Sequence, residues 1–248
     1  MSDAMWAGTV AFAGHEGAEL EAYLARPLSE EPRGGVVVIH HLPGYDEPHK
    51  EITRRFASRG YAAVCPNLYS REGKDVSPDD QAAAVRARGG LPDEQVVGDV
   101  AGAAAYLNSL DHANGRIGVI GYCSGGRQTF LVACSLQIDA AVDCYGGFVV
   151  NPPPADSPFA MTPLLSKAPN LSCPLLGLFG ADDKFPSPDE VKVLSDELDR
   201  LGKEHEFHTY PDAGHAFFAV DRSAYRPAAA VEGWKKVFEF FGRHLSSS

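Results

Sequence analysis

The stretch that decides the fold is "RIGVIGYCSGGRQTFLVACSL", residues 116–136. The part up to Cys123 is rich in small and β-branched residues and favours a buried strand, whereas the part from Ser124 favours a helix. The junction reads Gly121-x-Cys123-x-Gly125, the pattern of a nucleophile elbow, in which a sharp turn holds a catalytic side chain above a sheet. A helix start also favours a thiolate. The sequence therefore predicts that Cys123 is a nucleophile, and the alternative is a structural cysteine in a glycine-rich strand end.

Strand-like and helix-like segments alternate along the rest of the chain. We expect further strands at Gly34–His41, Tyr61–Leu68, Asp139–Gly146, Cys173–Gly180 and Glu204–Pro211, and an antiparallel hairpin formed by residues 9–14 and 20–27. We expect helices at Asp46–Gly60, Asp93–Leu110, Ser187–Gly202 and Pro227–Leu245. Repeated strand–helix units produce a mostly parallel sheet with helices on both faces. The pattern thus predicts an α/β fold, and residues 1–248 are expected to form one domain.

Composition excludes several classes of protein. The 248 residues are 44% hydrophobic and carry a formal net charge of −11, which argues against nucleic acid or an anionic membrane as a partner. No apolar run approaches the ~20 residues of a membrane span, and no basic start with an apolar core marks a secretory leader. The five cysteines are odd in number and form no CxxC pair. These features predict a cytoplasmic protein with reduced thiols.

A cysteine nucleophile needs a base, and the base needs a carboxylate that orients it. On an elbow fold these groups follow in the chain order nucleophile, acid, histidine, on loops after later strands. The segment "LLGLFGADDKF" supplies Asp182 and Asp183 after one strand, and "HTYPDAGHAFF" supplies His215 after the next. Exposed acids after strands are common, so neither aspartate indicates a catalytic role alone. The evidence for a triad is that a cysteine, an acid and a histidine occur in the expected chain order.

Four motifs together, "GYCSGG", "FGADDKF", "YPDAGHAFF" and "GYAAVCPNLY", resemble the dienelactone hydrolase family of small cysteine-dependent α/β-hydrolases. The resemblance extends from about residue 34 to residue 245. It implies an α/β-hydrolase fold and a catalytic triad of Cys123, Asp183 and His215. Asp183 is preferred because the family acid stands three residues after the glycine that ends the strand, here Gly180. Asp182 remains the alternative, and its simpler interpretation is a solvated turn residue.

The oxyanion hole of this fold uses the amide after the nucleophile and an amide from the loop after an earlier strand. These positions correspond to Ser124 and to Leu42 in "HHLPGYD", and the resemblance supports both. One departure concerns His41, because well-known family members have a glutamate there that holds the resting thiol. His41 is expected to contact substrate or to lie beside Cys123, and the alternative is a histidine satisfied at a strand end.

Arginines often bind a substrate carboxylate in this family. Arg86 and Arg127 are the candidates retained here, with Arg88 and Arg222 as further possibilities, although each is also typical of a surface residue. A family arginine that follows the catalytic histidine is replaced by Ala219. A long proline-rich segment, residues 146–170, can also contribute to a pocket, through Phe159, Met161, Leu164 and Leu165, and the alternative is a loop that only packs on the surface.

His40, His41 and His49 raise the question of a metal, with Asp46 and Glu47 nearby. Adjacent histidines on a strand point to opposite faces, so His40 and His41 cannot both bind one ion without distortion. We therefore expect no metal and no cofactor.

The resemblance implies hydrolysis of an ester or lactone, of the carboxymethylenebutenolidase type, through a thioester acyl-enzyme. The alternatives are a short-chain carboxylesterase or organophosphate hydrolase with the same triad, or a thiol sensor on a hydrolase scaffold. The expected partner is a small-molecule ester or lactone, without nucleic acid or membrane. The chain is expected to be a monomer or weak homodimer.

Overall fold

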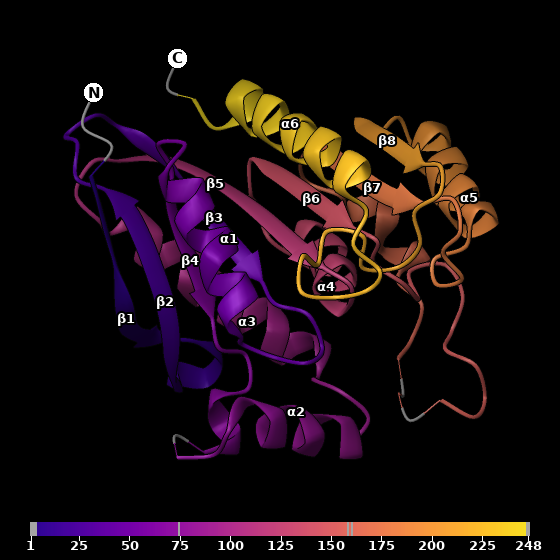
Figure 1. Ribbon diagram of the computed structural model, residues 1–248, viewed down its shortest axis with the longest axis horizontal. Helices are drawn as coiled ribbons and strands as arrows, with labels where there is room; N and C mark the ends of the chain where they lie inside the picture. Colours follow the sequence, from indigo (N-terminus) through magenta and orange to yellow (C-terminus); the bar gives the residue numbers. More distant parts are fainter. Residues whose placement is uncertain (1–3, 74, 158, 160, 247–248) are drawn as a thin grey trace.

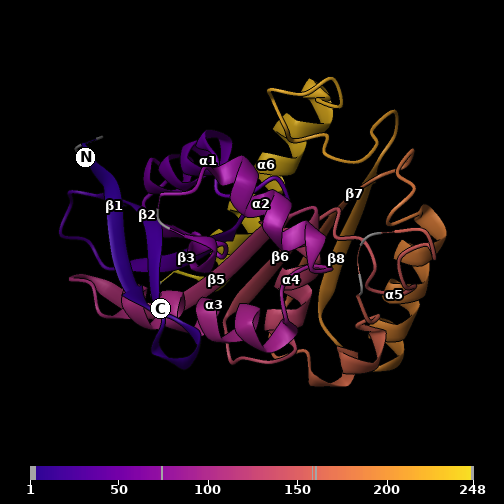
Figure 2. The ribbon, with the colours of Figure 1, turned by 90° about the horizontal axis from the view of Figure 1, so that it is seen from below.

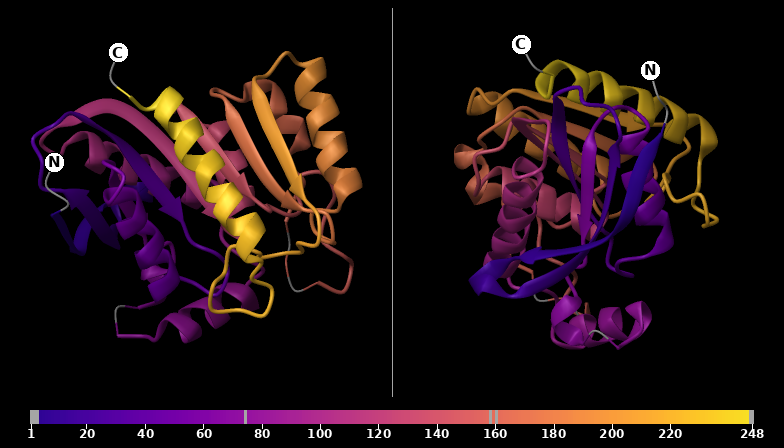
Figure 3. Two further views of the ribbon diagram at one scale, coloured as in Figure 1. Left: turned by 45° about the horizontal axis from the view of Figure 1, so that its top comes forward. Right: turned by 90° about the vertical axis from the view of Figure 1, so that its left-hand side faces the viewer.

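Eight strands form one sheet in the order β1-β2-β4-β3-β5-β6-β7-β8 in a computed structural model that describes residues 4–73, 75–157, 159 and 161–246 (Figure 1). The strands are β1 (Met5–Ala13), β2 (Glu19–Pro27), β3 (Arg33–Ile39), β4 (Ala62–Pro66), β5 (Ala113–Tyr122), β6 (Ala140–Cys144), β7 (Leu175–Gly180) and β8 (His205–Tyr210). β1 and β2 form the expected antiparallel hairpin, and β2 pairs antiparallel with β4 (Figure 3). All pairs from β4 to β8 are parallel.

Helices cover both faces of this sheet, as the alternating pattern predicts. α1 (Glu47–Ala57) and α6 (Pro227–His244) pack on one face, and α3 (Asp93–Asn108), α4 (Ser124–Ala133) and α5 (Pro188–Arg200) on the other (Figure 2). Phe56 and Phe241 are fully buried in one core, and Val100 and Phe130 in the other. Burial of the sheet on both faces explains why its central strands are almost wholly apolar.

One helix, α2 (Pro78–Ala87), was not expected from the sequence. Ser77 caps it by accepting a hydrogen bond from the amide of Asp80, and Ala82 and Val85 are its buried apolar side chains. Two small apolar contacts give only a weak periodic signal, which is why the pattern is missed. Short 3₁₀ turns complete the structure, at His15–Gly17, Ser70–Glu72 and Leu165–Asn170. Among the described residues, no helix combines the length and apolar character that a bilayer span requires.

The site is positioned by the carboxyl ends of the parallel strands. Leu42 follows β3, Cys123 follows β5, Asp183 follows β7, and His215 follows β8. Because parallel strands end at the same edge of a sheet, four segments distant in sequence meet there. α2 and the described parts of the loop between residues 150 and 164 extend beyond this edge, at the bottom of the view in Figure 1.

Candidate active site

Cys123 lies on the turn between β5 and α4 with φ 58° and ψ −119°, a left-handed conformation that is uncommon for residues other than glycine. The turn is tight: a Cβ atom on Gly121 would lie 2.0 Å from the carbonyl oxygen of Gly125, which would forbid it. The amide of Cys123 donates to the carbonyl of Cys144 on β6 at 3.0 Å and ties the elbow to the sheet. This geometry raises the thiol above the sheet, as the motif predicts.

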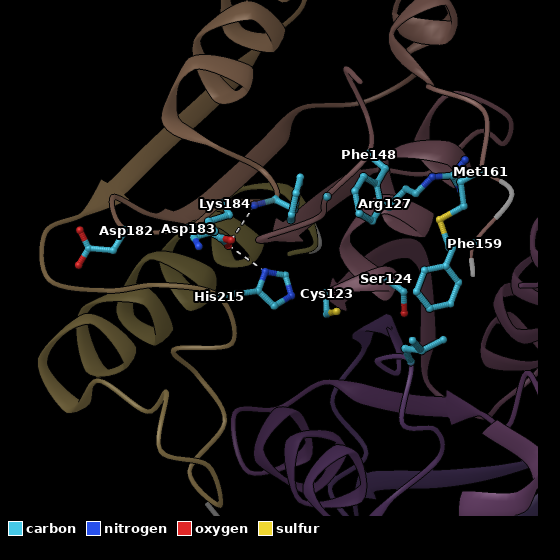
Figure 4. A pocket seen from close by; sticks show the side chains of 13 residues that line it. Cys123, Ser124, Arg127, Phe148, Phe159, Met161, Asp182, Asp183, Lys184 and His215 are labelled. Carbon is cyan, nitrogen blue, oxygen red and sulfur yellow. Dashed lines mark hydrogen bonds and ion pairs between the residues drawn. The ribbon is translucent and has the colours of Figure 1, made fainter. Parts of the chain in front are cut away.

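His215 and Asp183 form the hydrogen-bonded pair that the chain order predicts. His215 Nδ1 lies 2.8 Å from Asp183 Oδ2, and Asp183 Oδ1 accepts a second bond from the amide of Phe185 at 2.9 Å. Asp183 is buried, whereas Asp182 is exposed and points away from the imidazole (Figure 4). The structure therefore brings Asp183, and not Asp182, to the histidine.

The imidazole of His215 faces the sulfur of Cys123, as Figure 4 shows. Burial lowers the pKa of His215, but hydrogen bonds to Asp183 and Cys123 outweigh that effect and raise it from 6.5 to about 10. The charged imidazolium is thus stabilised on both sides. Such an arrangement favours the imidazolium form of His215 at neutral pH.

A cavity of about 410 Å³ opens in front of this pair. Its apolar wall is formed by Leu42, Phe148, Phe159, Met161 and Phe185. Phe148 and Phe185 pack with their ring centroids 5.4 Å apart. A volume of this size with mostly apolar walls and a few polar groups is typical of a small-molecule site.

The two amides expected to form an oxyanion hole both belong to residues that line this cavity, Leu42 and Ser124. Ser124 is the first residue of α4, so its N–H has no acceptor within the helix. Leu42 lies in a turn, and within the described residues its N–H donates to no backbone or side-chain acceptor. Two unengaged donors beside a nucleophile are what a tetrahedral oxyanion requires.

Of the two arginines proposed for substrate binding, only Arg127 reaches the cavity. It is 5% exposed, its Nη1 lies 3.3 Å from Asp93 Oδ1, and its Nη2 donates to the carbonyl of Thr162 at 2.8 Å. Its Nε is buried without a hydrogen-bond partner among the described residues. Arg86 lies on α2 and is not part of the cavity wall that the described residues form. Its position gives no support to a substrate-binding role.

The whole of this site lies within a stretch that matches a known family. The dienelactone hydrolase family matches residues 20–245. The protein belongs to the dienelactone hydrolase family. It is 34% identical over 235 residues to a Salmonella typhimurium protein named "Putative carboxymethylenebutenolidase", with 92% of this chain and 84% of that protein covered.

Two further relatives agree with this assignment. The "Carboxymethylenebutenolidase" of Pseudomonas putida is 28% identical over 232 residues, which cover 91% of this chain and 92% of that protein. A solved structure described as a "Putative Dienelactone Hydrolase" from Klebsiella pneumoniae has a TM-score of 0.82 and 30% identity, covering 97% of this chain and all of that chain. These matches confirm the α/β-hydrolase fold and the assignment to a family of hydrolases.

His41, where other dienelactone hydrolases are expected to have glutamate, does not line the cavity that contains Cys123, as far as the described residues define it. Its Nε2 lies 2.6 Å from Asp46 Oδ2, and Asp46 Oδ1 lies 2.6 Å from His49 Nδ1. His40 points elsewhere and accepts a hydrogen bond from the amide of Leu68. The two adjacent histidine side chains diverge, as expected, and the side chain of His41 binds Asp46 rather than Cys123.

Several wall residues were missed by sequence reasoning. Phe148, Lys184 and Phe185 line the cavity, and Tyr145, which is not part of its described wall, packs its ring edge-on against that of His215 with the centroids 5.1 Å apart. Tyr145 and Phe148 have φ values of 47° and 62°, a conformation that a sequence without glycine at those positions does not signal.

Some side chains of the proline-rich segment line the cavity, and others are buried in the core. Phe159 and Met161 line the cavity as expected, but Leu164 is fully buried in the core and Leu165 packs against it. Leu164 is held there because its amide donates to the carbonyl of Val149 at 2.8 Å.

Proposed function

We propose that this protein hydrolyses carboxylic esters and lactones by nucleophilic catalysis, with Cys123 as nucleophile, His215 as base and Asp183 as the orienting acid. The observation that carries the proposal is the continuous chain of contacts from the buried Asp183 through His215 to the thiol, which opens into an apolar cavity. A nucleophile, a base and an orienting carboxylate in this order are the groups that acyl transfer by nucleophilic catalysis requires. Membership of the family and the printed names of its relatives support the same reaction class.

Acylation begins when the thiolate of Cys123 attacks the carbonyl carbon. The carbonyl π electrons move onto oxygen, and the amides of Leu42 and Ser124 donate hydrogen bonds to that oxyanion. The intermediate then collapses, the C–O bond to the leaving group breaks, and the imidazolium of His215 gives its proton to the departing alkoxide. A thioester on Cys123 and a neutral imidazole remain.

Deacylation depends on a change in the basicity of His215. Cys123 contributes to the raised pKa of His215 through its hydrogen bond and charge, and a neutral thioester provides neither. The pKa of His215 therefore falls after acylation, because burial still lowers it and only Asp183 still raises it. The imidazole can then take a proton from water at neutral pH. The resulting hydroxide displaces Cys123 as thiolate and releases the carboxylic acid.

Thiolate chemistry limits the substrates. In the tetrahedral intermediate, a thiolate leaves more easily than a poorly stabilised alkoxide or an amine, so amides and simple alkyl esters tend to revert. Lactones with enol-type leaving groups, enol esters and aryl esters are the proposed substrates. A panel of lactones, aryl esters, short alkyl esters and organophosphates separates this proposal from a general carboxylesterase or an organophosphate hydrolase.

The covalent intermediate supplies the test of the mechanism. Brief reaction with p-nitrophenyl acetate followed by acid quench is expected to leave one acetyl group on the protein, and peptide mass spectrometry is expected to locate it on Cys123. Acetylation at another residue, or turnover without any acyl-enzyme in a quench before steady state, would contradict the thioester route.

The pKa change in His215 gives a second prediction. The ring protons of His215 are expected to titrate near pH 10 in the free enzyme, and at lower pH in Asp183→Asn, because the carboxylate that favours imidazolium is absent. Alkylation of Cys123 with iodoacetamide is expected to lower the titration point also, since the thioether carries no charge. NMR titration measures all three, with His215→Gln identifying the resonance. An unchanged titration point after alkylation would rule out the proposed switch.

Arg127, whose side chain lines the cavity, is proposed to bind a carboxylate or carbonyl oxygen of the substrate. We expect Arg127→Gln to raise KM about tenfold for mono-p-nitrophenyl succinate, which carries a free carboxylate, because one charge-assisted hydrogen bond is lost. p-Nitrophenyl acetate should be affected much less, which controls for loosening of the contacts to Thr162 and Asp93. An equal loss with both substrates would assign Arg127 a structural role.

A further inference from the structure

The segment that carries the Leu42 amide is fixed by hydrogen bonds with two histidine side chains, one as acceptor and one as donor. The N–H of His41 donates to Nε2 of His49 at 3.3 Å. The carbonyl of His41 accepts a bond from Nδ1 of His40 at 2.8 Å and another from the amide of Gly44 at 3.0 Å. Both the N–H and the carbonyl of His41 therefore have fixed hydrogen-bond partners, although His41 lies beyond the end of β3.

The next carbonyl is held as well, because the hydroxyl of Tyr69 donates to the carbonyl of Leu42 at 3.0 Å. The N–H of Leu42 is left with no acceptor within the described residues, and Leu42 lines the cavity beside Cys123. This N–H belongs to the same peptide unit as the carbonyl of His41. Two hydrogen bonds to that carbonyl polarise the peptide and make its N–H a better donor.

His40 is held in one neutral tautomer. The amide of Leu68 donates to His40 Nε2 at 3.2 Å, so this nitrogen carries the lone pair and Nδ1 carries the proton given to the carbonyl of His41. His40 is 1% exposed, and burial lowers its pKa to about 3. Its orientation therefore does not change across the physiological pH range.

His49 is fixed in the same way by Asp46. Its Nδ1 donates to Asp46 Oδ1, which leaves Nε2 free to accept the N–H of His41. Burial lowers the pKa of His49. Burial would raise the pKa of Asp46, but hydrogen bonds from His41 and His49 hold it well below its usual value. Asp46 also accepts from the amide of His49 and caps α1, so the carboxylate itself is rigidly placed.

We propose that His40, His41, Asp46 and His49, which we call the histidine clamp, are positioning residues that aim the Leu42 amide at the substrate oxyanion. The inference rests on the proposed function, because an oxyanion forms only in acyl transfer. It also gives His41 a role in the place of the family glutamate. The side chain of His41 donates to Asp46 and stabilises the carboxylate that orients His49, instead of contacting the thiol.

A metal ion is the competing interpretation of these residues. Ligand atoms of His41, Asp46 and His49 all lie within 4.8 Å of one another, a spacing that can surround an ion. The hydrogen bonds already use both ring nitrogens of His49, Nε2 of His41 and both oxygens of Asp46. An ion would have to displace protons from two of these bonds and release the backbone of His41.

The test compares His49→Ala with His49→Gln, whose side-chain oxygen can still accept the N–H of His41. We expect kcat for p-nitrophenyl acetate to fall about 10²-fold in His49→Ala, as displacement of a catalytic group by about 1 Å can produce. KM is expected to change little. His49→Gln should recover most of the loss. His205→Ala, a half-buried histidine bonded to Ser195 away from the site, is the matched control and should retain wild-type activity.

Alkylation of Cys123 by iodoacetamide distinguishes positioning from general damage, because this substitution forms no oxyanion. The alkylation rate is expected to stay within about twofold of wild type in His49→Ala, although ester hydrolysis falls. If His49→Ala loses alkylation and ester hydrolysis to the same extent, or loses neither, the proposed role of the histidine clamp is wrong.

Two further outcomes are decisive. If Zn²⁺ raises the melting temperature of the wild type but not of Asp46→Asn, the residues form a metal site and the proposed clamp is wrong. If neither Zn²⁺ nor EDTA changes the melting temperatures, the clamp is supported. Ester hydrolysis that survives in Cys123→Ala overturns the proposed function, whatever the His49 variants show.

Discussion

Cys123→Ala is expected to lower kcat/KM for p-nitrophenyl acetate by at least about 10³-fold, to the level that an oxyanion hole and substrate binding supply alone. The loss should be this large because alanine cannot form the thioester. The fold should survive, because Cys123 is only partly buried and its backbone, not its sulfur, makes the bond to Cys144. Stopped-flow measurement of nitrophenolate release checks both the burst and the steady state.

Cys134→Ala is the matched control for this variant. Cys134 is buried at the end of α4, and burial raises the pKa of its thiol to about 12, so it is neither accessible nor ionised at neutral pH. This control should retain full turnover and the acyl-enzyme burst. Activity in Cys123→Ala within tenfold of wild type would remove the nucleophile from the proposal. Equal loss in both variants would point to damage of the fold.

Gly121→Ala is expected to destabilise the protein by about 3 kcal/mol, at the upper end of the range for overpacking substitutions, and to abolish activity in the molecules that still fold. The added Cβ would lie 2.0 Å from the carbonyl oxygen of Gly125 and 2.7 Å from Oγ1 of Thr129. The nearest obstacle is backbone, which cannot rotate away, so the elbow must open and move Cys123. Urea denaturation measures the change in the free energy of unfolding.

Gly242→Ala provides the opposite expectation at a glycine with space around it. Gly242 lies in the last turn of α6, its φ is ordinary, and a Cβ there would meet nothing within 4 Å. Alanine should stabilise the helix by about 0.5–1 kcal/mol and leave turnover unchanged. If both glycine variants unfold alike, close packing at the elbow is not the reason that Gly121 is needed.

The central strands of the sheet could be predicted well because they are buried on both faces. Val36, Val37, Val38 and Ile39 are fully buried, and such continuous apolar runs stand out in a sequence. α2 could not be predicted, since Ala82 and Val85 are its only apolar side chains that are buried among the described residues. Boundaries also moved by a few residues, and β3 ends at Ile39 rather than at His41. The two residues beyond that end are the ones whose backbone the histidine clamp holds.

The candidate site was predictable where chemistry imposes an order on the chain. Cys123, Asp183 and His215 each follow a strand, and the elbow glycines mark the first of them. Without the family motif, Asp182 and Asp183 could not be told apart as the orienting acid, because they are adjacent carboxylates on one loop. The direction of each side chain decides, and only Asp183 points back into the molecule.

The sequence by itself determined the class of sheet and predicted the proposed nucleophile and the order of its partners, because each depends on local periodicity or on residues close together in the chain. Only the tertiary structure decided which arginine lines the cavity, which other side chains form its wall, and which partner the side chain of His41 binds. Those outcomes depend on contacts between segments far apart in sequence: Asp93 and Thr162 orient Arg127, and a carboxylate at the start of α1 draws His41 away from Cys123. Such side-chain contacts produce no hydrophobic periodicity in either segment, so they cannot be predicted from the sequence pattern.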